Sequence, residues 1–405
     1  MAVRGCRIER FAEHRRAALL RSWPGVGAVH VPLNHAAPDG PGFDLAYAEA
    51  GAEQAGPTLV LVPGGPGLAS VLPYRKVRAR LAAHGLHVVT PEHRGVGLSR
   101  HTPDGAVLPA DAVTLEQAAC DVLAVRDAVG GERAILAGSS YGGYLALEAA
   151  RRAPGRFDAL VLDSTAATVC RLERDRQRAC FWDGTEPGFA RRAERVRAIA
   201  TRGIATDDEL ALALPLVYEL AGLDAVDALL TRAEGGHVRA LKRLHRLAAQ
   251  EVEGGRKPLV FDGDLTLPIW LGRIAPERPD GGPFDRSRAL TAVRAAHPDL
   301  PDDPFDARPW LSEVTVPALI LQGARDMRIP PAAVDELATG LPDARRITFA
   351  HAGHDLLRLR TRACGLILAG LARGGLDGAE RAATAVAAAR PRWEPWAARI
   401  ASALP

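Results

Sequence analysis

The stretch "LAGSSYGG" (residues 136–143) places Ser140 at the centre of a Gly-x-Ser-x-Gly pattern. A short apolar run precedes the pattern and a helical pattern follows it, so Ser140 falls on a sharp strand-to-helix turn. Small residues two positions before and after the serine let strand and helix approach closely, and the turn lifts the hydroxyl out of the sheet. We therefore predict that Ser140 is a nucleophile and that Ser139 is structural. A serine-rich helix cap is the alternative interpretation.

A serine hydroxyl is a weak nucleophile, so it needs a base that is oriented by a third group. Asp326 follows the apolar run "ALILQG", and His354 follows the run "RRITFA". The chain order Ser140, Asp326, His354 is typical of a catalytic triad built around such a turn. We predict that His354 accepts the proton of Ser140 and that Asp326 fixes the tautomer of the imidazole.

Other residues near these strand ends remain open as alternatives. His351 directly adjoins the last strand, where a histidine more often packs. Asp355 is expected to begin the next helix as an N-terminal acid. Asp163, at the end of "ALVLDS", is an alternative acid for the triad, and Arg325 could simply pair with Asp326 at the surface.

Acyl transfer also needs donors for the negative oxygen of the tetrahedral intermediate. The glycine-rich segment "PGGPG" (63–67) follows the apolar run 58–62, where the loop that supplies one backbone N–H is expected. We assign Gly65 and the N–H of Tyr141 to this oxyanion hole. A plain tight turn is the alternative interpretation of the segment.

The elements around these residues alternate between apolar runs and helical patterns over about 120 residues. Such alternation predicts a mostly parallel sheet with helices on both faces, an α/β fold. The alternation stops after residue 164, where an Arg-rich helical stretch follows. It resumes near residue 313. We predict a core formed by residues 1–164 and 313–405, and a mainly helical cap, or lid, formed by residues 165–312 that covers Ser140.

Composition excludes several other classes of function. The 405 residues include 51 basic and 48 acidic side chains, and this near balance gives no electrostatic reason to expect nucleic acid or an anionic membrane as a partner. The first 20 residues carry charges throughout and lack the apolar region of a signal peptide, so we expect a cytoplasmic protein. The cysteines lack metal-ligand spacing, and we expect neither a metal nor another cofactor. The oligomeric state stays open.

The motifs together resemble the proline iminopeptidase branch of the α/β-hydrolase superfamily. The resemblance rests on "GGPG", "EHRGVGLS", "GSSYGG", "GARD" and "AGH", and it covers roughly residues 40–165 and 312–372. It implies an α/β-hydrolase fold, a serine hydrolase mechanism and a helical cap. The chain departs from the family pattern at Pro63, where the family usually has His, and at Glu92, where it usually has Asp.

The resemblance implies an aminopeptidase, such as a tripeptidyl aminopeptidase, that holds the free amine of a small peptide with cap carboxylates. Glu219, Asp262 and Asp264 are the candidates, and Glu219 is preferred because its neighbours are apolar. An esterase, amidase or lactonase acting on a small molecule is the alternative, favoured by an apolar cap wall. A non-catalytic binding protein is disfavoured by the presence of the triad. Epoxide hydrolase and dehalogenase chemistry is disfavoured because those enzymes carry Asp in place of Ser140.

Overall fold

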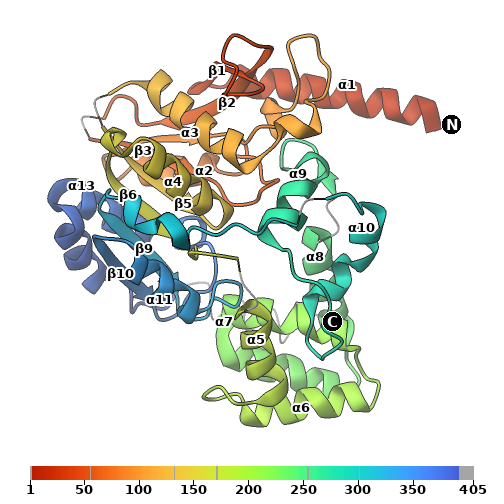
Figure 1. Cartoon of the computed structure of the whole chain (residues 1–405). Helices are drawn as coiled ribbons and strands as arrows, with labels where there is room; N and C mark the ends of the chain where they lie inside the picture. The colour runs from red at the N-terminus through yellow and green to blue at the C-terminus, as the bar shows by residue number, and fades with distance from the viewer. Residues whose placement is uncertain are drawn as a thin grey trace.

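A twisted sheet of eight strands forms the centre of the protein in the computed structural model, which describes residues 2–54, 56–131, 133–169, 172–252, 255–300 and 302–391 (Figure 1). The strand order is β1-β2-β4-β3-β5-β6-β9-β10. β1 and β2 are antiparallel to their neighbours, and the other six strands run parallel to one another. The predicted α/β fold is therefore confirmed. The strands of this sheet are β1 (Val26–Pro32), β2 (Gly42–Ala50), β3 (Thr58–Val62), β4 (His87–Pro91), β5 (Ala134–Ser139), β6 (Phe157–Asp163), β9 (Ala318–Gly323) and β10 (Ala344–Phe349).

Helices cover both faces of the sheet because its central strands are apolar throughout. In β3, Val60 and Val62 join the hydrophobic core on one face, and Leu59 and Leu61 join the core on the other. This alternation follows from the two-residue period of a strand. The first core includes α3, α4 and α11, and the second includes α2, α12 and α13. The bounds of these helices are α2 (Arg75–Ala82), α3 (Leu115–Val129), α4 (Tyr141–Arg152), α11 (Pro331–Gly340), α12 (Leu356–Leu359) and α13 (Thr361–Thr384).

Local chemistry sets the ends of α3 and the shape of α13. Thr114 accepts a hydrogen bond from the Gln117 N–H at the start of α3, and Gly130 ends that helix. Residues 376–384 form the second part of α13, which ends at Thr384. The backbone leaves helical geometry at Gly374 and Gly375, so α13 is kinked there.

The region between β6 and β9 folds around a hydrophobic core of its own, built mainly by α6 and α7. It also contains a two-stranded antiparallel ribbon, β7–β8, that the sequence does not predict. The ribbon contacts the core of the protein, since the Ala69 N–H donates to the Val260 carbonyl at 3.0 Å and the Asp262 N–H donates to the Gly67 carbonyl at 2.9 Å. The elements of this region are α5 (Leu172–Arg178), α6 (Ala190–Thr201), α7 (Asp207–Glu234), α8 (Arg239–Val252), β7 (Arg256–Lys257), β8 (Phe261–Asp262), α9 (Gly263–Ile269) and α10 (Thr291–Ala296). We call it the lid; its boundaries at residues 164 and 312 remain a prediction.

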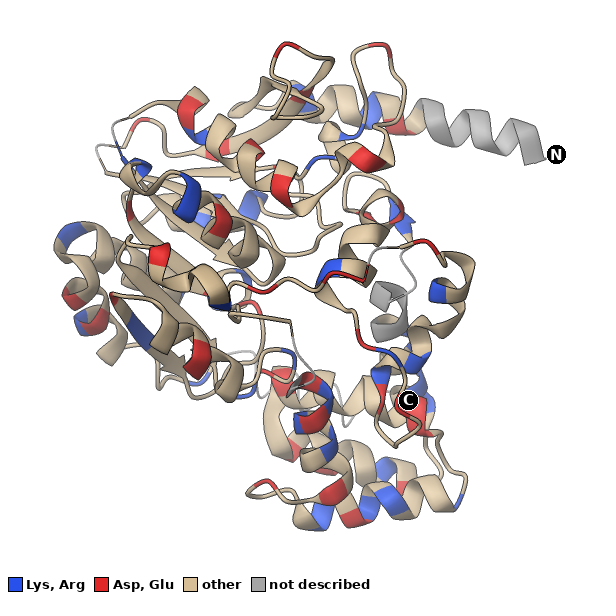
Figure 2. Ribbon diagram, in the orientation of Figure 1, with Lys and Arg blue, Asp and Glu red and all other residues tan. Residues whose placement is uncertain are grey.

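The N-terminal helix α1 (Ala2–Arg21) extends away from the sheet (Figure 1). Acidic and basic residues are interspersed over the described ribbon, the lid included (Figure 2). Within the described ranges, no helix combines the length and the apolar character needed to cross a membrane. Cys120, Cys180 and Cys364 are free thiols, whereas the Cys6 side chain and Cys170 lie outside what the structure describes.

Candidate active site

Ser140 lies on the tight turn between β5 and α4, in a backbone conformation that residues other than glycine rarely adopt. Its φ is 52° and its ψ is −119°, and its N–H donates to the Asp163 carbonyl at 2.8 Å. Such strain persists only where the surrounding structure enforces it. A Cβ on Gly138 would lie 2.2 Å from the Gly142 carbonyl oxygen, and one on Gly142 would lie 2.3 Å from the Val62 carbonyl oxygen. The small residues of the motif are therefore sterically required.

The structure brings Asp326 and His354 into direct contact. His354 Nδ1 lies 3.0 Å from Asp326 Oδ2, and Asp326 is fully buried. The other carboxylate oxygen of Asp326 accepts hydrogen bonds from the N–H groups of Arg328 and Ile329, each at 2.9 Å. Because the carboxylate can only accept, the proton of a neutral imidazole sits on Nδ1 and leaves Nε2 free to act as a base.

The pKa values of this pair move in the directions expected of an ion pair. Burial alone would raise the pKa of Asp326, but the charge of His354 and the hydrogen bonds keep that pKa below its ordinary value. Burial likewise disfavours a charged His354, yet the charge of Asp326 and the hydrogen bond between them raise the pKa of His354 overall. The arrangement thus stabilises an imidazolium, which is what proton abstraction from a serine requires.

Ser140 and His354 line the same cavity, whose volume is about 450 Å³. Core and lid share its walls: Gly64 and Gly65 come from the loop after β3, and Glu219 comes from α7 of the lid. Residues of the lid and of the core thus line one cavity, and the role of the lid as a cover over Ser140 stays a prediction. The role of Ser140, Asp326 and His354 as a triad remains a prediction that this geometry supports.

The two predicted oxyanion donors also fit this position. Gly65 lines the cavity, and the neighbouring Gly64 is so close that a Cβ on it would lie 3.5 Å from the Ser140 Cβ. Tyr141 is the first residue of α4, where an N–H has no acceptor within its own helix. Both N–H groups belong to backbone that surrounds Ser140, and their role stays a prediction.

The alternative residues occupy other positions. His351 Nδ1 lies 3.0 Å from Nη2 of Arg325, so these two side chains contact each other. Asp163 is fully buried and accepts hydrogen bonds from the first N–H groups of α12, those of Leu356 and Leu357, at 3.1 and 2.9 Å. Asp163 therefore holds the helix after His354, while Asp326 holds the imidazole.

Ser139 and Asp355 form a structural contact next to the site. Ser139 is 1% exposed and its hydroxyl donates to Asp355 Oδ1 at 3.1 Å. Asp355 precedes α12 as the sequence predicts, but its side chain makes no capping hydrogen bond and pairs instead with Arg358 at 2.6 Å. The buried, hydrogen-bonded state of Ser139 agrees with its assignment as a structural serine.

The three lid carboxylates differ sharply in their surroundings. Asp264 pairs with Arg100 through two hydrogen bonds of 2.8 and 2.6 Å. Asp262 is buried and accepts hydrogen bonds from Arg256 and from the Gly97 N–H at 2.6 and 2.8 Å. Neither residue is part of the cavity lining, because arginines and backbone of the core hold both carboxylates elsewhere. Glu219 does line the cavity, so of the three it alone stays a candidate for substrate binding.

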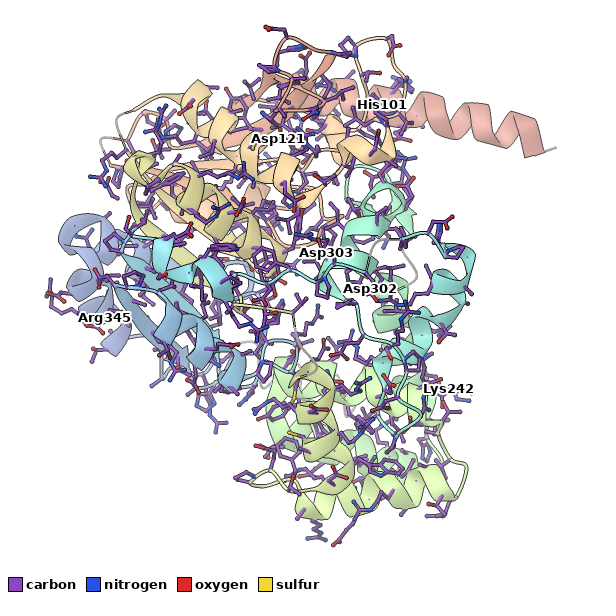
Figure 3. The ribbon with its side chains drawn as sticks, in the orientation of Figure 1. His101, Asp121, Lys242, Asp302, Asp303 and Arg345 are labelled. Atoms are coloured by element: carbon purple, nitrogen blue, oxygen red, sulfur yellow. The ribbon has the colours of Figure 1, made fainter. Side chains whose placement is uncertain are left out.

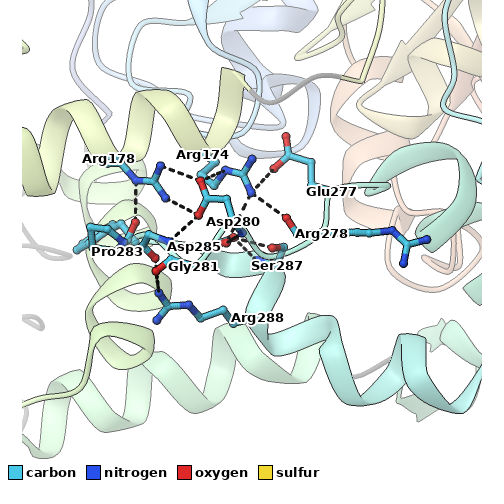
Figure 4. A network of polar contacts seen from close by, with 12 residues as sticks. Arg174, Arg178, Glu277, Arg278, Asp280, Gly281, Pro283, Asp285, Ser287 and Arg288 are labelled. Atoms are coloured by element: carbon cyan, nitrogen blue, oxygen red, sulfur yellow. Dashed lines mark hydrogen bonds and ion pairs between the residues drawn. The ribbon is translucent and has the colours of Figure 1, made fainter.

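Sequence reasoning missed a second carboxylate of the cavity wall, Glu277. It lies in a polar network with Arg174 (Figure 4), whose Nη1 is 3.9 Å from Glu277 Oε2 and whose Nε is 3.4 Å from Asp280. Oε1 of Glu277 is enclosed without a hydrogen-bond partner among the described residues. Burial, together with nearby acids, raises the pKa of Glu277 to about 7 although Arg174 opposes the shift. Its segment, "APERPDGGPFD", reads as a solvated loop, so the sequence offered no signal.

Comparisons with known proteins bear on the fold of the chain. Residues 57–214 match the family model described as "alpha/beta hydrolase fold". A serine hydrolase from the polyaromatic hydrocarbon-degrading bacterium Cycloclasticus zankles matches with a TM-score of 0.51 and 18% identity, over 87% of this chain and 100% of that one. A proline iminopeptidase from Mycobacterium smegmatis matches at 19% identity and a TM-score of 0.45, over 89% and 99% of the two chains. An esterase from Thermogutta terrifontis matches at 18% identity and a TM-score of 0.44, over 84% and 96%. The family match, together with the mostly parallel eight-stranded sheet, shows that the chain has the α/β-hydrolase fold.

Proposed function

We propose that this protein is a serine hydrolase that cleaves a peptide-like amide next to a free amino group, an aminopeptidase similar to the proline iminopeptidases. The observation that carries the proposal is that Ser140 and the His354–Asp326 pair meet a lid carboxylate, Glu219, in one cavity. Its substrate would be a small peptide or a small molecule of related chemistry, and its location the cytoplasm.

Acylation follows from the positions of the hydrogen-bonding groups. His354 Nε2 takes the proton of Ser140 as Oγ attacks the substrate carbonyl, and Asp326 stabilises the imidazolium that forms. The N–H groups of Gly65 and Tyr141 bind the oxygen that becomes negative. His354 then donates its proton to the leaving amine, so the C–N bond breaks and an acyl-Ser140 ester remains.

Deacylation reverses these roles with water as the nucleophile. His354 removes a proton from a water molecule, the resulting hydroxide attacks the ester, and the tetrahedral oxygen occupies the same two N–H groups. Ser140 recovers its proton from His354 when the ester bond breaks. The acid product leaves, and the groups return to their starting protonation states.

Recognition of the amine rests on the two carboxylates of the lid wall. Glu219 is buried, and burial raises its pKa, although Arg328 at 3.8 Å offsets part of that effect. Glu277 retains an enclosed oxygen without a partner among the residues described. A substrate ammonium could add a closer ion pair with these carboxylates than the arginines at 3.8 and 3.9 Å provide, whereas an acylated nitrogen could not.

Esterase, amidase or lactonase activity is the second candidate, and the apolar part of the same wall favours it. Trp270, Ile274 and Leu290 also line the cavity. An apolar acyl group would bury its surface against these side chains at about 25 cal/mol per Å².

A substrate pair that differs only at the amine tests the proposal. The purified protein should hydrolyse aminoacyl p-nitroanilides with a free amine at least about 100-fold faster, in kcat/KM, than the N-acetylated forms, which corresponds to about 3 kcal/mol. Equal rates on both forms, or faster hydrolysis of simple p-nitrophenyl esters, would reject the aminopeptidase and favour the second candidate.

A further inference from the structure

The loop of residues 63–71 carries one of the two predicted oxyanion donors, Gly65, and begins at a residue without a side-chain hydrogen bond. Pro63 stands first in the loop, and proline has neither an N–H nor a polar side chain. Pro63 can therefore be held by a hydrogen bond only if another residue donates to its carbonyl oxygen.

That carbonyl is held by the imidazole of His93, which lies 30 residues later in the chain. His93 Nε2 is 3.0 Å from the Pro63 carbonyl oxygen, and the side chain is buried. Because the carbonyl can only accept, the proton of the imidazole must sit on Nε2. Burial lowers the pKa of His93 to about 4, even though its hydrogen bonds to the loop oppose the shift. The imidazole is thus neutral, and the contact is independent of pH in the range where His354 titrates.

His93 also contacts the second donor. Its ring packs edge-on against the ring of Tyr141, with centroids 5.2 Å apart. The Pro63 carbonyl oxygen lies where a Cβ on Gly142 would be only 2.4 Å away, so the nucleophile turn packs against the same carbonyl. One buried imidazole therefore touches both segments whose N–H groups must converge on the oxyanion.

The residues on either side anchor His93 itself. Glu92 accepts hydrogen bonds from the N–H groups of Ser70 and Val71 at 2.7 and 2.8 Å, which fixes the far end of the same loop. Arg94 pairs with Asp121 through two hydrogen bonds of 2.6 Å; Asp121 comes from α3 (Figure 3). Of these three consecutive residues after β4, Glu92 binds the end of the loop, His93 binds its start, and Arg94 binds α3.

We infer that His93 is a positioning residue for the oxyanion hole, whose neutral imidazole sets the Gly65 N–H relative to the Tyr141 N–H through the Pro63 carbonyl. The inference rests on the proposed serine hydrolase function. It implies that loss of the hydrogen bond from His93 Nε2 to the Pro63 carbonyl weakens binding of the tetrahedral intermediate more than binding of the substrate.

Two amide variants of different length separate positioning from folding. Gln places its N–H near the position of an imidazole Nε2, whereas Asn is too short to reach the Pro63 carbonyl. We expect His93→Gln to keep kcat within about threefold of wild type. His93→Asn should lower kcat about 10- to 100-fold and leave KM nearly unchanged. This loss of kcat is smaller than that for removal of an oxyanion donor itself, which is about 10²- to 10³-fold. An aryl boronic acid, which forms a tetrahedral adduct on a serine, should bind His93→Asn more weakly by the same factor.

His87→Asn is the matched control, because His87 is the first residue of β4 and its Nε2 lies 2.8 Å from Glu49 Oε2, away from the loop. Its kcat should match wild type. If His93→Asn does not fold, His93→Leu takes its place. Unchanged kcat and unchanged boronic acid affinity in a folded Asn or Leu variant would overturn the inference, as would an equal loss in the Gln variant. A wild-type protein that neither hydrolyses an ester or amide nor reacts with a fluorophosphonate would instead reject the proposed function.

Discussion

The Glu219 carboxylate of the lid accepts a hydrogen bond from the Met327 N–H at 2.8 Å, one residue after Asp326. On its other side, Glu219 packs against the residue before His354, since a Cβ on Gly353 would lie 2.5 Å from the Glu219 Cβ. A single lid residue therefore contacts the loop of the proposed triad acid and the loop of the proposed triad base. Any change at Glu219 must be judged by both substrate preference and catalytic chemistry.

Glu219→Gln should reduce the preference for free-amine over N-acetylated substrates. Removal of one partner of a buried ion pair costs about 3–5 kcal/mol, so the preference should fall by two decades or more if the substrate ammonium pairs with Glu219. The ratio of kcat/KM values for the two substrates measures the effect.

Glu194→Gln, at an exposed position of α6, is the control and should leave this ratio unchanged. A Glu219→Gln protein that loses activity equally on both substrates would show that Glu219 supports the two loops and does not recognise the amine. Glu277→Gln then identifies whether the second wall carboxylate carries the preference.

Ser140→Ala should abolish labelling by a fluorophosphonate probe, because Ser140 is the serine on the strained turn next to His354. Ser139→Ala should remain labelled, since the Ser139 hydroxyl is enclosed and donates to Asp355. Gel fluorescence of the labelled proteins measures the result. Labelling that persists in Ser140→Ala would refute the nucleophile assignment.

Asp326→Asn should lower kcat about 10⁴-fold, because the amide no longer stabilises the imidazolium or the required tautomer. The pH profile should move as well. His354 acts as a base only when neutral, and its pKa is raised, so wild-type kcat/KM should rise with pH through an apparent pKa above the ordinary histidine value of 6.5. In Asp326→Asn the charge that raises the pKa of His354 is gone and burial lowers that pKa. The rise of kcat/KM with pH should therefore shift to lower pH. If the rise of kcat/KM occurs at the same pH in the variant, a residue other than His354 acts as the base.

Asp163→Asn should flatten the dependence of stability on pH. Burial and the nearby Asp355 raise the pKa of Asp163 to about 7 in the folded state, against 3.8 for an ordinary aspartate. Between those values the folded protein keeps a proton that the unfolded chain has released, so the free energy of unfolding decreases as the pH rises. Urea unfolding of both proteins at pH 4.5 and 7.5 measures this contribution. Equal decreases in wild type and variant would contradict it.

Local sequence patterns predicted the parts of the site that depend on single turns. The glycines around Ser140 are needed because a Cβ on Gly138 would collide with the backbone of Gly142, and a Cβ on Gly142 would collide with the backbone at the end of β3. The order of apolar runs predicted that Ser140, Asp326 and His354 follow parallel strands, and parallel strands bring their carboxyl ends to one edge of the sheet. The composition of β3 and β5 likewise predicted strands buried on both faces.

Side-chain partners across long distances in the chain were decided by the tertiary structure alone. Whether Asp163 or Asp326 faces His354 depends on the direction in which each loop leaves its strand, and no spacing in the sequence encodes that direction. Asp262 and Asp264 look like free carboxylates in the sequence, yet folding brings the Gly97 N–H and Arg100 against them. The sequence by itself determined which residue types stand at the strand ends. The packing of the lid and the turn after β4 decided which charges remain available, because a charge is neutralised by whatever the fold places within a few ångströms of it.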